Sequence, residues 1–119
     1  MSKRPIPLLL DDMWEAIERV ERYTKGITHE TFVRDEKTTD AVVRNLEVIG
    51  EAANRLPEEF KGQHSEIAWP QIVGLRHRIV HDYFGIDLAL VWQILQQDLP
   101  AFKAKLRPLR SADQQSRPR

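Results

Sequence analysis

The stretch DAVVRNLEVIGEAANRLP, residues 40–57, decides the fold of this 119-residue chain. Its apolar side chains are spaced alternately by four and three positions: Val42, Leu46, Ile49, Ala53 and Leu56. An α-helix turns once every 3.6 residues, so this spacing places these side chains on one face. Pro57 ends the pattern, because proline cannot continue a helix. The stretch therefore predicts an amphipathic helix with one buried face.

Two further segments carry the same helical spacing. The first holds apolar residues at Leu10, Met13, Trp14, Ile17 and Val20. The second holds them at Leu88, Trp92, Leu95, Leu99, Phe102 and Leu106. A shorter helix is expected from about Pro70 to Tyr83, because proline suits the first helical position, and Gly85 would close it.

Capping and breaking residues mark the ends of these segments. Candidates for the N-cap of the central helix are Asp35, Thr38, Thr39 and Asp40. Asp87 is the expected N-cap of the last helix, and Gly26 is the expected stop of the first. Pro100 should bend or break the last helix, because it removes a backbone donor. The segment 26–35 has room for one extra turn.

Four or five helices joined by short links predict an all-α fold, an antiparallel up-and-down bundle. The sequence shows no strand-like alternation and no internal repeat. A length of 119 residues suits one domain with one modest core. We expect a helical domain over residues 1–108 and a flexible basic tail over residues 109–119.

The charges balance over the whole chain but not along it. Lys and Arg number 18, as do Asp and Glu, which excludes a globally basic nucleic-acid-binding surface. Residues 1–102 carry a net charge of −5, and residues 103–119 carry +5. The basic end is either a solvated tail or a contact for RNA.

The chain contains no cysteine, which excludes disulfides, thiolate nucleophiles and zinc fingers and fits a reducing cytoplasm. The longest apolar runs are a few residues, so no segment is expected to span a membrane or to act as a signal peptide. We therefore expect a soluble, cytoplasmic protein.

The densest group of reactive side chains is RHRIVHDY, residues 76–83. Apolar residues flank it, so its polar groups are expected at the edge of a buried surface, where binding energies and pKa shifts are larger. Arginine offers a rigid fork of donors that suits a phosphate, and it stays charged. Histidine titrates near neutrality and can pass a proton.

Helix geometry limits how these side chains can act together. At about 100° per residue, Arg76 and Tyr83 are about 20° apart and share a face. Arg76 and His81 differ by about 140° and do not converge on a regular helix. Either the helix unwinds near His81, or a second copy of the chain completes the site in an isologous dimer.

A phosphate clamp with a proton-transfer group, without a thiol or a carboxylate cluster, suits metal-independent cleavage of RNA. RNA brings its own nucleophile, the 2′-hydroxyl, so the protein needs only to deprotonate it and to stabilise the crowded phosphorane. The products would carry a cyclic phosphate and a free 5′-hydroxyl.

The spacing Arg76-x4-His81-x-Tyr83 resembles the R-x4-H-x-Y signature of the HEPN superfamily and, within it, of the HepT-like toxins of prokaryotes. Further stretches that fit this family are GLRHRIVHDYFG at 74–85, AVVRNLEVIGEAA at 41–53, Trp69-Pro70 and Asp98-Leu99-Pro100. The similarity covers about residues 8–107. His77 stands where asparagine is more usual, although the superfamily tolerates other polar residues there.

The resemblance implies a homodimeric helical bundle that cleaves RNA, tRNA or mRNA, at the dimer cleft, with Arg76 and His81 catalytic and no metal or cofactor. It also implies an antitoxin partner, an MNT-type minimal nucleotidyltransferase that attaches AMP to Tyr83. The added phosphodiester would bring negative charge and bulk beside Arg76 and compete with substrate phosphate. Glu51 and Arg55 match the Glu-x3-Lys/Arg pair of the wider superfamily, which implies a supporting role beside Arg76 or His81.

Other interpretations of these residues stay open. Arg76 can form a structural ion pair with Glu51, and Tyr83 can be a half-buried core residue. His77 and His81 are spaced as in a helical metal site, but no obvious third ligand follows. The tryptophans are expected to anchor the core or a dimer interface rather than to stack on bases: Trp14, Trp69 and Trp92.

Two other functions compete with a toxin ribonuclease. The chain can be a non-catalytic dimeric subunit that binds and regulates a nucleotidyltransferase, but such a subunit has less need for both the arginine and the histidine. It can also be a small nucleotide-binding helical protein. The absence of a glycine-rich phosphate loop counts against that interpretation.

Overall fold

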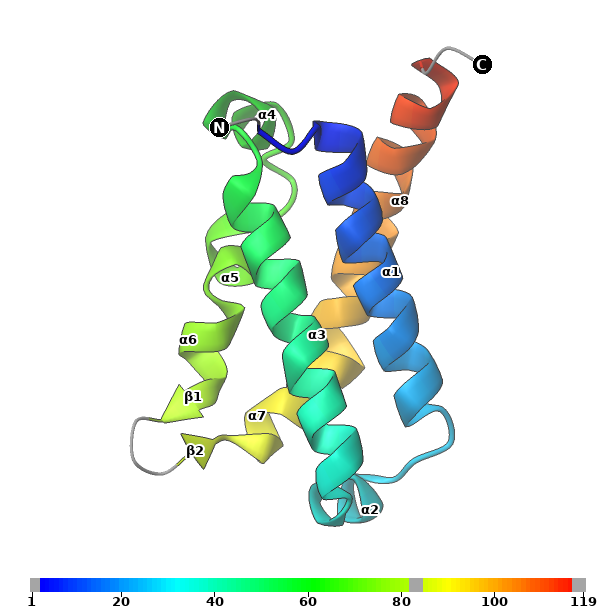
Figure 1. The fold of residues 1–119 in the computed structure, drawn as a ribbon, viewed down its shortest axis with the longest axis vertical. Coiled ribbons are helices and arrows are strands. Elements are labelled where there is room, and N and C mark those ends of the chain that lie inside the picture. Colours follow the sequence, from blue (N-terminus) through cyan, green and yellow to red (C-terminus); the bar gives the residue numbers. More distant parts are fainter. Residues whose placement is uncertain (1–2, 82–84, 117–119) are drawn as a thin grey trace.

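The computed structural model describes residues 3–81 and 85–116 (Figure 1). Its helices are α1 (Ile6–Thr24), α2 (His29–Arg34), α3 (Glu36–Arg55), α4 (Glu58–Gln63), α5 (Trp69–Val73), α6 (Leu75–Ile79), α7 (Leu88–Gln93) and α8 (Leu99–Ser116). Two short strands, β1 (Val80–His81) and β2 (Gly85–Ile86), precede α7, and a π-helical turn, Ile94–Asp98, joins α7 to α8. The predicted all-α fold is confirmed apart from this small hairpin.

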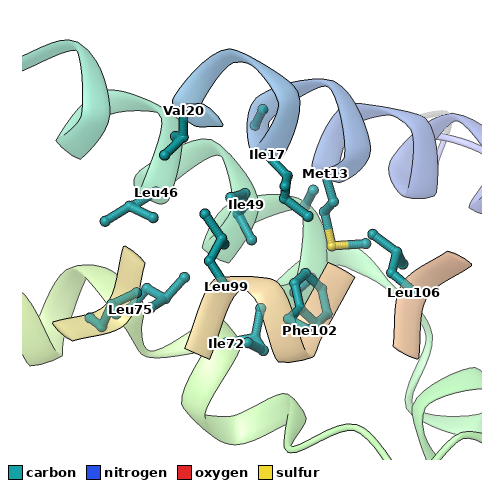
Figure 2. Close-up of a cluster of buried hydrophobic side chains, with 14 of the residues drawn as sticks. Met13, Ile17, Val20, Leu46, Ile49, Ile72, Leu75, Leu99, Phe102 and Leu106 are labelled. Atoms are coloured by element: carbon teal, nitrogen blue, oxygen red, sulfur yellow. The ribbon is translucent and has the colours of Figure 1, made fainter. Parts of the chain in front are cut away.

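The helices α1 and α3 lie side by side and run in opposite directions (Figure 1). The helix α8 packs against α1, while α5 and α6 pack against α3. Figure 2 shows side chains from these elements pointing into one shared core: Met13, Ile17, Val20, Leu46, Ile49, Ile72, Leu75, Leu99, Phe102 and Leu106. The apolar faces predicted from the sequence therefore form the core.

The predicted helix ends are confirmed by their hydrogen bonds. Asp35 caps α3, because its carboxylate accepts from the backbone N–H of Thr38 at 3.1 Å and from the Thr38 hydroxyl at 2.6 Å. Asp87 caps α7 in the same way, accepting a backbone N–H at 3.0 Å. Gly26, with a φ of 74°, follows the end of α1. The extra turn expected in 26–35 is α2.

The helix predicted over residues 70–83 is shorter than expected. Gly74 separates α5 from α6, and α6 ends at Ile79. The next residues form β1, which pairs antiparallel with β2. The backbone N–H of Asp87 donates to the Ile79 carbonyl at 2.8 Å, and Gly85 has a φ of 78° that other residues rarely adopt. Gly85 therefore begins the second strand, opposite His81, instead of closing a helix.

Pro100 should bend or break the last helix, and the α-helical pattern is indeed interrupted next to it, although the chain remains helical. A π-helical turn lies directly before it, and α8 continues to Ser116. This wider turn moves a carbonyl away from the proline ring, which would clash with it in a regular α-helix. The buried stripe therefore continues past the proline through Ile94, Leu95, Leu99, Phe102 and Leu106.

The helix α8 runs past residue 108, where the sequence predicts the start of the tail. Leu109 continues the apolar stripe and is buried. The Nη2 atom of Arg110 lies 3.1 Å from Asp11 Oδ1 on α1. Residues 117–119, the end of the predicted tail, lie outside the described residues. Over residues 3–81 and 85–116, no helix has the length and apolar character that a membrane span requires.

The half-buried Trp14 of α1 lies beside three cations of α8. Lys103 Nζ is 5.0 Å from the centre of its ring, and the guanidinium carbons of Arg107 and Arg110 are at 5.0 and 4.7 Å. Lys103 also forms an ion pair of 2.7 Å with Glu21. Trp14 therefore helps to fasten α8 to α1, whereas Trp69 is buried in the core, as predicted.

Candidate active site

A glycine sets how closely α5 approaches α3. A Cβ atom at Gly50 would lie 3.1 Å from the backbone oxygen of Ile72 and 3.3 Å from that of Val73. Both neighbours are backbone atoms, which cannot move aside as the end of a flexible side chain can. Gly50 therefore lets α5 lie directly on α3, and α6 follows α5 along the same helix (Figure 1).

An open, polar concavity of ≈ 810 Å³ lies between α3 and the segment that contains α5 and α6. It is lined by Glu47, Gly50, Glu51, Asn54, Arg55, Val73 and Arg76. Three residues singled out in the sequence, Glu51, Arg55 and Arg76, therefore line the same concavity although they come from two elements.

Arg76 is an exposed cation of this concavity, as is Arg55. The Arg76 side chain is 74% exposed, and its Nε lies 3.8 Å from Oε1 of Glu47. The ion pair that we considered between Arg76 and Glu51 is therefore replaced by a pair with Glu47, one turn earlier on α3. The guanidinium is accessible to a phosphate from solvent, and its fixed charge and fork of donors suit that ligand.

The other arginine of the motif has a structural contact. Arg78 Nη2 donates to Asp98 Oδ2 at 3.0 Å, and both side chains are half-buried. This pair ties α6 to the π-helical turn before α8. His77, between the two arginines, is exposed and is not among the residues that line the concavity.

The backbone of His81 lies in β1, opposite Gly85 of β2. Because α6 ends at Ile79, the angle of about 140° expected for a continuous helix does not apply to Arg76 and His81. Of the two arrangements considered from the sequence, unwinding before His81 is the one that one copy of the chain adopts. Tyr83 lies outside the described residues.

Comparisons with a family model and with known proteins point to the same family. The family described as "Ribonuclease HepT-like" matches residues 13–109. A protein of Thermococcus cleftensis named "Probable ribonuclease HepT" is 43% identical over 101 residues, which cover 85% of this chain and 92% of the relative.

Two further relatives carry the name "Putative RNase". One, from Caldanaerobacter subterraneus subsp. tengcongensis, is 37% identical over 107 residues, 90% of this chain and 95% of its own. The other, from Methanocaldococcus jannaschii, is 37% identical over 106 residues, 89% of this chain and 97% of its own. No solved structure matches the chain significantly. The match over most of the sequence shows that the chain belongs to the HepT-like ribonuclease family of the HEPN superfamily.

Proposed function

We propose that this protein is a metal-independent endoribonuclease, the toxin of a cytoplasmic toxin–antitoxin pair, with tRNA or mRNA as its substrate. The observation that carries the proposal is an exposed Arg76 in a polar concavity, five residues before His81, in a member of a ribonuclease family. Glu51 and Arg55 line the same concavity and would support the site. His77, the neighbour of Arg76 in the sequence, is the third residue proposed to support it.

The proposed reaction uses the 2′-hydroxyl of RNA as the nucleophile. This oxygen loses its proton and attacks the adjacent phosphorus, the bond from phosphorus to the 5′-oxygen breaks, and the leaving 5′-oxygen takes a proton. The products are a 2′,3′-cyclic phosphate and a 5′-hydroxyl. An imidazole at His81 is suited to either proton transfer, and Arg76 would stabilise the additional negative charge on the phosphorane.

The direct test is cleavage of a panel of RNAs by the purified, unmodified protein in buffer that contains EDTA. We expect cleavage with cyclic phosphate ends, and we expect Arg76→Ala and His81→Ala to abolish both cleavage and growth arrest. Intact RNA throughout the panel would refute the nuclease. If the protein also binds a nucleotidyltransferase tightly and is not toxic alone, it is a regulatory subunit instead.

We further propose that the working unit is a homodimer in which the Arg76 and His81 sets of two copies meet in one cleft. In one copy the concavity is open to solvent, and Arg76 is mostly exposed. A second copy would exclude water there and strengthen the attraction between guanidinium and phosphate.

Mixing the two inactive variants tests the dimer. If the site is shared, Arg76→Ala and His81→Ala protomers refolded together should regain part of the activity, because each supplies the group that the other lacks. Each variant refolded alone is the control. No recovery in a mixture shown by mass spectrometry to contain heterodimers would contradict a shared site.

We propose that an MNT-type nucleotidyltransferase neutralises the protein by attaching AMP to Tyr83. The phosphodiester would bring negative charge close to the arginine that binds the substrate. Intact-mass measurement after co-expression should show one or more added AMP groups, and Tyr83→Phe should show none. A wild-type mass without addition, in the presence of an active transferase, would refute this regulation.

A further inference from the structure

We propose that Glu47 is a positioning residue that orients Arg76. The inference goes beyond the sequence motif, which points to Glu51, and its kinetic readout rests on the proposed nuclease function. The observation behind it is the ion pair between Glu47 Oε1 and Arg76 Nε at 3.8 Å.

Arg76 requires such a partner because packing does not fix its side chain. The side chain is 74% exposed, and α6 holds only five residues. A long, free arginine side chain samples many rotamers, and ordering it has an entropic cost. Catalysis is sensitive to displacements of about 1 Å, so a charged neighbour that restricts Arg76 would raise the fraction of productive conformations.

Glu47 is well placed for this role. It lies on α3, the longest helix described, and its side chain is 32% exposed, less than half the exposure of Arg76. Its second oxygen, Oε2, lies 4.0 Å from Nη1 of Arg44 on the same helix. The carboxylate therefore lies within 4.0 Å of two arginines, one from its own helix and one from α6.

The geometry leaves the phosphate-binding end of Arg76 available. The ion pair is made through Nε, and the guanidinium also carries two terminal amino groups that can donate to an anion. Glu47 can therefore hold Arg76 while a phosphate binds. Its negative charge also opposes the phosphate, so removing it should weaken turnover and strengthen RNA binding at the same time.

A spectroscopic experiment tests the contact without reference to catalysis. The Nε–Hε resonance of Arg76 is recorded at low temperature by ¹H–¹⁵N NMR and assigned by its loss in Arg76→Lys. We expect it to shift in Glu47→Gln. The control is Glu30→Gln, which also removes a glutamate paired with an exposed arginine, Arg34, at 3.1 Å. The Arg76 resonance should not shift in this variant. An unchanged Arg76 resonance in Glu47→Gln would overturn the inference.

Kinetics of RNA cleavage then tests the consequence for the reaction. We expect Glu47→Gln to lower kcat by about two- to fivefold, the range that an exposed ion pair sustains, while KM falls or stays constant. Glu30→Gln should change neither value. If Glu47 acts only by repelling RNA, kcat of Glu47→Gln will equal that of the wild type, and the positioning role is refuted.

The two proposals fail in different ways. A wild-type protein that cleaves no RNA refutes the nuclease, yet the Arg76 resonance still decides whether Glu47 holds the guanidinium. If the wild type cleaves RNA but Glu47→Gln changes neither the Arg76 resonance nor kcat, only the positioning role is refuted.

Discussion

Arg76 and Arg78 lie close together on one short helix, yet their surroundings differ. Arg76 faces an open concavity, whereas Arg78 is half-buried and bonded to Asp98. The residue type does not distinguish the two arginines, and only the resemblance to the R-x4-H-x-Y motif identifies Arg76 as the catalytic candidate. The structure supplies the physical difference. Arg78 donates a hydrogen bond of 3.0 Å to Asp98 through a terminal amino group, whereas Arg76 meets Glu47 at 3.8 Å through Nε and leaves its terminal amino groups available to a phosphate.

This division of roles predicts opposite effects of two matched substitutions. Arg78→Gln should lower the free energy of unfolding by about 0.5–1 kcal/mol, because it removes a half-buried ion pair between α6 and the π-helical turn. Arg76→Gln should leave that free energy nearly unchanged and reduce RNA cleavage by about 100-fold or more. Urea denaturation and cleavage assays measure the two effects. Equal losses of stability would contradict the assignment.

Gly50 provides a second prediction about a single residue. Gly50→Ala forces a Cβ against two backbone oxygens of α5, so we expect the free energy of unfolding to fall by about 1–3 kcal/mol. The control is Gly62→Ala on α4, where a Cβ meets nothing within 4 Å and stability should be unchanged or slightly higher. Two variants of equal stability would show that α5 can move away from α3 freely.

The sequence did not predict that Glu47 is the partner of Arg76, because the pairing depends on tertiary packing. Glu47 and Glu51 are one turn apart on the same face of α3, and both line the concavity. Which of them meets Arg76 depends on how far along α3 the helix α6 lies. That position is set by packing between distant segments, including the contact at Gly50, and no local pattern records it.

The helices follow from the sequence where local physics decides them. Periodic apolar residues, capping aspartates and helix-ending residues predicted α1 with its end near Gly26, α3 with both ends, and the start of α7, because side chain and backbone interact within a few residues. The end of α6 was missed because it depends on pairing with β2 and on the hydrogen bond from Asp87 to Ile79. His81, the proposed catalytic histidine, consequently lies on a strand rather than on a helix.

The N-cap of α3 predicts a titration at the level of the element. Hydrogen bonds from the Thr38 hydroxyl and backbone N–H lower the pKa of Asp35 below its usual 3.8. The folded state therefore gains stability from this carboxylate above that pH and loses it as the pH falls through the lowered value. In Thr38→Val the pKa should rise toward 3.8, measured by NMR of the carboxyl carbon, and in Thr24→Val it should not. An unshifted Asp35 in Thr38→Val would exclude the hydroxyl as the main cause.

At the scale of the whole molecule, the uneven charge along the chain helps to attach the C-terminal helix α8 to the N-terminal helix α1. The sequence suggested a basic tail that is solvated or touches RNA. In the structure, basic side chains of α8 pair with acidic ones of α1, Arg110 with Asp11 and Lys103 with Glu21. The apolar spacing already extended to Leu106, and one further step to Leu109 would have carried the helix past the predicted boundary.

Two truncations test this attachment. A chain that ends at Pro108 loses buried Leu109 and the ion pair of Arg110, so its free energy of unfolding should fall by about 2 kcal/mol. A chain that ends at Ala112 keeps both and should change by less than about 0.5 kcal/mol. Urea denaturation followed by tryptophan fluorescence measures both. If the shorter chain is as stable as the longer one, the end of α8 contributes no packing.

The hairpin that carries His81 has two residues in each strand. Paired strands of this size have little stability of their own, and each packs one partly buried apolar side chain against the bundle core, Val80 from β1 and Ile86 from β2. Such a part can open while everything else stays folded. On warming, RNA cleavage by the proposed nuclease should therefore be lost below the melting temperature of the bundle. Cooling should restore the cleavage.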